Sequence, residues 1–398
     1  MVRYFCVPLL AGAFFSAATA QTLKDAVEAA WMRSATGAAH GVRAEEARAK
    51  RETARTWFPE PPSISAGYQT DQIDRNKGAR EIEIEFELPF ATPRVRAVNA
   101  TAGDAEAAAL ESNQRAAKIR LAAEVRDAYW GARIARIEAD VAQRKLDEAN
   151  QLAADVERRF QAGDVARVDL NQARSNALAA QTAAAKAALE AQQAMRAFAL
   201  LTGLPQLPVD AEAAADRDAP PVDEHPLVAA ARAQAQSAKA RFDQASLATR
   251  DPPGLGLRLL RERGESGERY GHQARIGITI PLGSDARNRP RITQANAERI
   301  EAETAWRLER ERTRAAMDAA QAELTTAQSA LATALARAAI ARDTQELTAR
   351  AYRLGELDLP SRLRAEAERF DAELSLARAE LEVGRAISRL NQAKGLLP

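Results

Sequence analysis

The chain has 398 residues, of which 46% are hydrophobic, 28% are charged and only 5% are aromatic. Apolar content carried by Ala and Leu, with charges of both signs interspersed, is typical of long helices with charged faces and disfavours a compact globular core. The net charge is only +1, and the Lys and Arg residues form no basic stripe, so we expect no nucleic-acid partner.

The first twenty residues have the pattern of a secretory signal peptide. Arg3 supplies a positive start, residues 5–15 are apolar, and Ala18-Thr19-Ala20 is a cleavage pattern before Gln21. The alternative, a membrane anchor, is disfavoured by the shortness of the segment. We therefore expect residues 1–20 to be removed and the mature chain to be exported. The only cysteine, Cys6, lies inside this segment, so the mature chain has no disulfide and no thiolate metal ligand.

A helix is predicted from about Thr22 to Arg55, and two candidate strands follow it, Ser63 to Gln69 and Glu81 to Pro89. The polar turn between the strands predicts a hairpin. In the second strand, glutamates at 81, 83, 85 and 87 alternate with the apolar residues Ile82, Ile84, Phe86 and Leu88. The apolar side could pack on a core, or it could face lipid while the glutamates face water. A cation-binding role for the glutamates is the less favoured alternative.

A helical hairpin is predicted after these strands. The first helix runs from Thr92 to about Gln161 and spans about 100 Å at 1.5 Å per residue. Gly163 and Asp164 break it, and a return helix runs from Arg167 to Leu201. Such a hairpin is far longer than a globular core needs. Residues 206–224, rich in Pro, Asp and Ala, are predicted to be a linker.

The second half of the chain repeats the first at an offset of 192 residues. Pro89 corresponds to Pro281 and Gly163 to Gly355, while Ile84, Phe86 and Leu88 correspond to Ile276, Ile278 and Ile280. We therefore expect two copies of one unit, residues 21–205 and 225–398. In the second copy the helices are predicted at Ile292 to Arg353 and Ser361 to Leu390. Four strands cannot close a barrel around a pore, so the hairpins either pack on helices or are pooled by three chains into twelve strands.

No pattern of catalytic residues or metal ligands is found. His40, His225 and His272 lie far apart, without metal-ligand spacing, and are expected to be solvated surface or turn residues. Met32, Met195 and Met317 are expected in the core. Phosphate-binding loops and nucleophile elbows are also missing from the sequence. We therefore expect no enzyme, no cofactor and no metal site.

The order helix, β-hairpin, long helical hairpin, present twice after a signal peptide, resembles the TolC-type outer-membrane efflux proteins. Local strings share the resemblance: residues 276–282 followed by Arg287-Asn288-Arg289, the two turns at 159–164 and 351–357, and the closing Leu201-Thr202-Gly203-Leu204-Pro205. The resemblance covers nearly the whole mature chain. It is closer to the CzcC-like heavy-metal branch than to the multidrug branch.

The resemblance implies a mainly α fold with a membrane β-barrel part. Each chain of a homotrimer would add four strands to a twelve-stranded barrel in the outer-membrane lipid, and the long antiparallel helical hairpins would form a helical barrel across the periplasm of a Gram-negative bacterium. It implies an exit duct of a tripartite efflux system, with a periplasmic adaptor (membrane fusion) protein and an RND-type inner-membrane transporter, passing heavy-metal cations. The alternatives are a multidrug or type I secretion channel, and a periplasmic coiled-coil adaptor or tether. An adaptor would need one helical hairpin and contiguous strands.

In the family, the turns of the helical hairpins form the periplasmic tip, where adaptor helices dock and acidic residues constrict the pore. By position, the resemblance assigns this tip to Gly163, Asp164, Asp169, Gly355, Glu356 and Asp358. The acidic position six residues after the glycine falls on Asp169 in the first copy but on Ser361 in the second. The position nine residues after it falls on Gln172 and Arg364. The chain therefore departs from the acidic gate of the multidrug branch.

Overall fold

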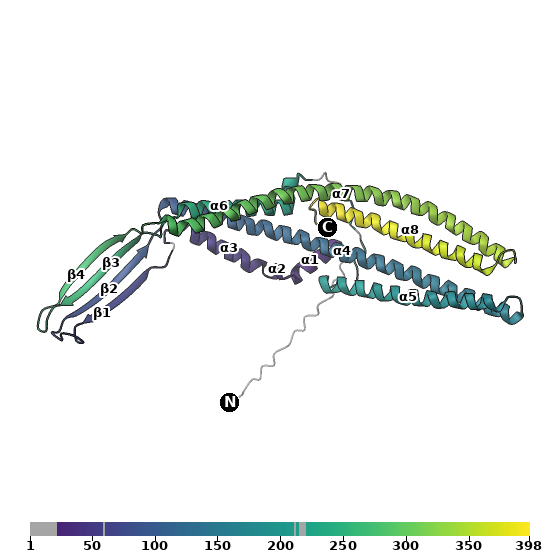
Figure 1. Ribbon diagram of the computed structural model, residues 1–398, viewed down its shortest axis with the longest axis horizontal. Coiled ribbons are helices and arrows are strands. Elements are labelled where there is room, and N and C mark those ends of the chain that lie inside the picture. Colours follow the sequence, from purple (N-terminus) through teal and green to yellow (C-terminus); the bar gives the residue numbers. More distant parts are fainter. Residues whose placement is uncertain (1–21, 59, 211, 215–219) are drawn as a thin grey trace, which may run out of the picture.

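The computed structural model describes residues 22–58, 60–210, 212–214 and 220–398, so the predicted signal peptide lies outside the described residues. Figure 1 shows an elongated molecule with a four-stranded sheet at one end and the turns of two helical hairpins at the other. No described helix packs over the sheet. The sheet and the hairpin turns are therefore the two ends of one long body.

The predicted N-terminal helix is three helices, α1 (Leu23–Arg33), α2 (Ala35–Ala38) and α3 (His40–Ala54). The prediction of one continuous helix was wrong because Ser34 is extended, with ψ at 145°, and its side chain accepts the N–H of Gly37. A Ser hydroxyl that bonds local backbone competes with the helical hydrogen bonds and favours a break. The break leaves α1 packed in the core and α3 against the long helix that follows the first hairpin.

The sheet contains β1 (Ser63–Thr70), β2 (Arg80–Pro89), β3 (Gly254–Arg263) and β4 (Gly271–Thr279), all antiparallel and in sequence order. The two hairpins join at the β2–β3 pair, so the sheet is shared by the two halves of the chain. Ile280 was predicted in the last strand but lies one residue beyond it. Strand β3 begins at Gly254, opposite Thr279, after two prolines, so Ile280 has no strand residue across from it.

Each half has one long helical hairpin: α4 (Pro93–Ala162) with α5 (Arg167–Thr202), and α7 (Asp285–Arg353) with α8 (Leu359–Ala393). Pro93 and Asp285 start the long helices, and they are separated by 192 residues, the offset of the sequence repeat. Helix α7 starts seven residues before the predicted Ile292 and includes Pro290. The earlier start is stabilised by Asn288, whose Nδ2 donates to the carbonyl of Thr249 at 2.7 Å.

Helix α4 is the centre of the packing, because it contacts α1, α3, α5, α6 (Pro226–Leu247) and α8. The main core lies midway along it. Its members are Leu23, Val27, Val125, Tyr129, Trp130, Phe198 and Leu381, with smaller alanines between them. This core ties α1 and both return helices to α4. None of the described helices is long and apolar enough to cross a membrane.

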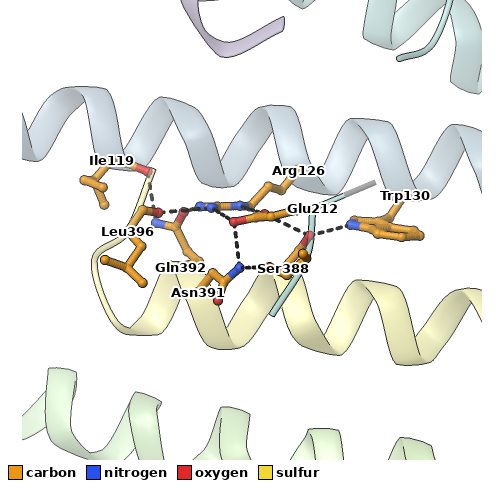
Figure 2. A network of polar contacts seen from close by, with 9 residues as sticks. Ile119, Arg126, Trp130, Glu212, Ser388, Asn391, Gln392 and Leu396 are labelled. Carbon is orange, nitrogen blue, oxygen red and sulfur yellow. Dashed lines mark hydrogen bonds and ion pairs between the residues drawn. The ribbon is translucent and has the colours of Figure 1, made fainter. Parts of the chain in front are cut away.

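The predicted linker is tied into this core by a buried polar network (Figure 2). Glu212 forms an ion pair with Arg126 of α4 at 2.6 Å, and the two side chains are only 8% and 4% exposed. Ser388 and Asn391 of α8 donate to the same carboxylate at 3.1 and 2.8 Å. Trp130 completes the network by donating its indole N–H to Ser388. The network therefore joins the linker to a helix from each half of the chain.

Two side chains differ from their predicted environments. His225, predicted to be a solvated surface or turn residue, is only 3% exposed, and its Nδ1 accepts the N–H of Leu227 at the start of α6. It is buried because it lies against the turn that ends α8, where a Cβ on Gly395 would be 2.7 Å from the imidazole. Met32, predicted in the core, is 76% exposed because α1 turns its other face, with Ala26, Val27 and Ala30, to the core.

Candidate functional site: a bare sheet and a paired helical tip

One face of the sheet is apolar and exposed. Paired residues in an antiparallel sheet lie on the same face, so the register builds rows of apolar residues across all four strands, such as Ile64, Phe86, Leu257 and Ile276. The exposed members are between 38% and 77% accessible: Ile64, Tyr68, Ile82, Ile84, Leu255, Leu257, Leu259, Ile276 and Ile278. A contiguous apolar face of this kind marks a surface that contacts a membrane or another protein.

The opposite face of the sheet is polar. The four glutamates of β2 lie on it together with Arg258 and Arg275. Glu83 forms an ion pair with Arg258 across the β2–β3 pair. The outer strands β1 and β4 each have one edge without a partner among the described strands. An unpaired edge is a template for pairing with another chain.

The two helical hairpins turn in the same way at the far end of the molecule. Gly163 and Gly355 adopt left-handed φ values of 84° and 80°. In each turn the N–H after the glycine bonds a carbonyl five residues earlier, from Asp164 to Arg159 and from Glu356 to Ala351. These are the bonds of a Schellman motif, which favours glycine at the left-handed position. No other atom lies within 4 Å of a Cβ built at either glycine, so both turns are open to solvent.

The acidic residues assigned to the tip have different environments. Asp164 and Glu356 are exposed and follow the two glycines directly. Asp358 caps α8 by accepting the N–H of Ser361 at 3.0 Å, and the hydrogen bonds from Ser361 lower the pKa of its carboxyl. Asp169 lies in the first turn of α5 and is half-buried. Asp358 is exposed as well, so three of the four carboxylates at the tip face solvent.

The two turns are packed together around Tyr352. This residue is buried with Leu152, Val156, Leu170 and Leu359, which come from both hairpins. The guanidinium carbon of Arg159 lies 5.3 Å from the ring centre, and that of Arg362 lies 5.0 Å from it. Burial raises the pKa of the Tyr352 phenol, while the two guanidinium groups oppose that rise. The aromatic ring between two cations couples the tips.

Ion pairs continue this coupling along the helices. Arg378 of α8 pairs with Glu138 of α4 at 2.6 Å, and Arg369 of α8 pairs with Glu148 of α4. Burial raises the pKa of the Glu148 carboxyl, and the charge of Arg369 opposes that rise. The contacts thus hold the second hairpin against the first between the core and the tip.

Two helices expose apolar stripes that the single chain does not cover. On α5, exposed apolar residues recur every ten or eleven residues, three turns of helix, at Val168, Leu178, Leu189 and Leu200. On α7 they are Ile300, Leu308, Leu335, Ile340 and Leu347. Within the described ranges, no group of three or more His, Cys, Asp or Glu residues could hold a metal ion.

The sequence analysis included Tyr352 and Arg159 in the two turn strings but assigned no role to them or to Arg362. A signal was present, because Tyr352 stands 192 residues after Phe160 and so occupies the same place in the second repeat. Both aromatic residues pack in the tip cluster. Glu212 was missed without such a signal, because a single glutamate in a Pro-, Asp- and Ala-rich segment carries no periodicity.

Comparisons with known proteins agree with this architecture. Residues 37–204 match the family described as outer membrane efflux protein. Among solved structures, CusC is similar with a TM-score of 0.79 at 18% identity, covering 95% of this chain and 92% of that one. The Campylobacter jejuni CmeC outer membrane channel gives 0.78 at 16%, covering 94% and 85%. The open Neisseria gonorrhoeae MtrE outer membrane channel gives 0.73 at 19%, covering 94% and 89%. A search of curated proteins found no match.

Proposed function

We propose that the chain is a TolC-type outer-membrane efflux protein and acts as the exit duct of a tripartite efflux system, because residues 37–204 match the outer membrane efflux family and solved outer membrane channels share its fold. In this proposal, substrate delivered at the helical tip passes along the helices and leaves through the sheet end. The chain acts as a passive channel and catalyses no reaction. A periplasmic coiled-coil tether is the weaker candidate, because nothing in that function needs an exposed apolar sheet.

The observation that carries the proposal is the bare sheet. Its apolar face is exposed over all four strands, its other face holds glutamates and arginines, and the helical tips lie at the opposite end (Figure 1). In a membrane barrel the apolar face contacts lipid and the charged face lines water. The glutamates at 81, 83, 85 and 87 then belong to the channel wall.

A homotrimer completes the barrel in this proposal. Within the described residues, strands β1 and β4 each have an unpaired edge, and closing a sheet removes such edges. Three chains would supply twelve strands. The same assembly would bury the apolar stripes of α5 and α7, each of which needs a neighbouring helix to cover it. The predicted membrane residues Ile82, Ile84, Phe86, Leu88, Ile276 and Ile278 would then face lipid.

The tip is proposed as the docking site for a periplasmic adaptor protein, with an RND-type transporter behind it. Gly163 and Gly355 shape the two turns, and Asp164 and Glu356 are exposed beside them. Tyr352 and the ion pairs to Glu138 and Glu148 hold the hairpins together, so they would keep the tip closed until a partner binds. Heavy-metal cations are the proposed substrate, with multidrug export as the alternative.

The proposed trimer is tested by cell fractionation and by measuring the mass of the detergent-solubilised protein. We expect the mature protein in the outer membrane and a mass of three chains by native mass spectrometry. The double variant Ile276→Asp and Ile278→Asp should lose membrane insertion, because charged side chains on the lipid-facing side of a strand destabilise a membrane barrel. Arg275→Asp, on the polar face of the same strand, is the matched control. A stable monomer in the soluble periplasmic fraction would refute the proposal.

A further inference from the structure

The apolar face of the sheet ends in a group of cations near the hairpin turns. Beyond the row that contains Ile84 and Leu259, the next row places Arg261 between Ile82 and His272. The last row places Arg80 opposite Arg263. Because paired residues share a face, these arginines continue the apolar face away from the helices.

The ring of Tyr270 contacts the guanidinium groups of two of these arginines. The guanidinium carbon of Arg261 lies 4.2 Å from the centre of the Tyr270 ring, and that of Arg263 lies 5.1 Å from it. Arg263 is also held by a hydrogen bond from its Nε to the carbonyl of Gly78 at 3.0 Å. The Nε of Arg80 is buried and finds no acceptor within the described residues. Donors of three arginines are therefore gathered at one place.

These arginines lack carboxylate partners. Within the described part of the chain, none of Arg80, Arg261 and Arg263 lies within 4.0 Å of an acidic oxygen, whereas Arg258 on the other face is paired with Glu83. The neighbouring Glu262 belongs to the polar face of the sheet, where its carboxylate accepts a hydrogen bond from Gln273. Three like charges beside apolar surface are stabilised by an anion that supplies the missing acceptors.

We propose that Arg80, Arg261 and Arg263, with Tyr270, bind the phosphate groups of lipid headgroups at the outer end of the membrane-facing surface. The inference rests on the proposed function, which places this face in the membrane. Arginine forks match phosphate oxygens, and tyrosine is favoured at the level of headgroups. Free phosphate has the same oxygens, but the arginines run without a break into the apolar rows of Ile82 and Leu259, which suit acyl chains. A phosphate-bearing lipid is therefore the occupant.

The test uses the full mature protein in detergent and bisphosphorylated lipid A as the probe, with lipid retention measured by native mass spectrometry. The double variant Arg261→Gln and Arg263→Gln should weaken lipid A binding about tenfold or more, since each lost charge-assisted hydrogen bond is worth about that factor. Arg261→Lys with Arg263→Lys should give an intermediate loss, because charge is kept and the fork is lost. Arg275→Gln removes one positive charge from the polar face of the sheet and should bind like wild type.

Flotation with phosphatidylcholine vesicles tests the membrane assignment of the sheet separately from the phosphate-binding site. Wild type and all variants should float with these vesicles, because the apolar rows are unchanged. Failure of the wild type to float would refute the membrane assignment and, with it, this inference. Flotation of every protein, combined with equal lipid A binding by wild type and the double glutamine variant, would overturn the phosphate site alone. Competition by millimolar inorganic phosphate as strong as that by lipid A would show a simple anion site and would also overturn it.

Discussion

At the residue scale, one buried ion pair holds three separate parts of the chain together. Arg126 and Glu212 are the least exposed ion pair among the described residues, and Ser388 and Asn391 also donate to the Glu212 carboxylate. Arg126 in addition donates to the carbonyl of Leu396 at 3.0 Å. A charge in such a place is stable only while its partners remain. The corresponding position in the second repeat, 192 residues after Arg126, is Asp318, so the second repeat has no arginine at this place.

We expect Arg126→Met to lower the free energy of unfolding by about 3–5 kcal/mol, because Glu212 would remain buried without its cation. The double variant Arg126→Met and Glu212→Met should recover much of that loss, since no isolated charge is left. Denaturant unfolding of the detergent-solubilised protein would measure both. Arg115→Met breaks the exposed pair with Glu111 and serves as the control with little effect. A loss in the double variant as large as in the single variant would contradict the ion-pair explanation.

His225 should make stability depend on pH. Burial lowers the pKa of its imidazole below the ordinary value of 6.5, and the neutral Nδ1 accepts the N–H of Leu227. Just below pH 6.5 the unfolded chain therefore binds more protons than the folded chain, so stability is present above that pH and is lost as the pH falls. Thermal unfolding between pH 5 and 8 would show this loss.

The variant His225→Asn tests whether His225 causes this pH dependence, and His40→Asn is its control. Asparagine keeps an acceptor for the helix start but does not titrate, so His225→Asn should lack the loss of stability between pH 6.5 and 5. His40 is exposed, and its replacement should leave the pH dependence unchanged. The same pH dependence in wild type and His225→Asn would assign the titration to other groups.

At the element scale, the contact between α4 and α8 depends on a glycine. A Cβ at Gly384 would lie 2.4 Å from the Trp130 ring, whereas a Cβ at Gly131, also in a long helix, has no atom within 4 Å. Alanine is the better helix former by about 1 kcal/mol, so Gly131→Ala should stabilise the protein slightly. Gly384→Ala should instead destabilise it by about 1–3 kcal/mol, because the helices must separate to admit the methyl group. Stabilisation by both changes would show that this helix contact is not tight.

The turn at the tip is an element whose shape we expect to matter for docking. Gly355 has a φ of 80°, and a β-branched residue there costs about 1 kcal/mol or more in backbone strain. Gly355→Val should therefore trimerise normally but lose adaptor binding and export about fivefold. Gly355→Asn tolerates the left-handed angle and should keep most of both. Full export by the valine variant would make the tip assignment wrong.

Local patterns predicted most of the elements, and contacts over long distances were not predictable. The alternation in β2 and the glycines at 163 and 355 are local signals, and the structure contains the strand and both turns. The break at Ser34 and the early start of α7 were missed because they depend on a side-chain hydrogen bond and on contacts with the end of α6. The burial of His225 and Glu212 arises from packing against α8, which no short window of sequence contains.

At the scale of the whole molecule, the two repeats together build a sheet at one end and a pair of helical turns at the other. Both hairpins enter one sheet, and both helical turns meet at the other end, about 100 Å away by the length of α4 at 1.5 Å per residue. Between the core and the tip, the two halves are joined by the ion pairs of Arg369 and Arg378 with glutamates of α4. At the tip itself they are joined by the packing around Tyr352. In the proposed duct, opening at the tip would require these contacts to break.

In the proposed assembly, this chain contributes little to the choice of substrate. A passive duct selects weakly, and the described residues offer no cluster of metal ligands. Carboxylates on the polar face of the sheet would favour cations over anions through their field without binding one tightly. We therefore expect deletion of the gene to sensitise cells to zinc, cobalt, cadmium or copper more than to dyes and detergents. Elemental analysis of the purified trimer should find no stoichiometric metal. Sensitivity to hydrophobic drugs alone would assign the duct to multidrug export, and a tightly bound metal at one per chain would overturn the passive-duct proposal.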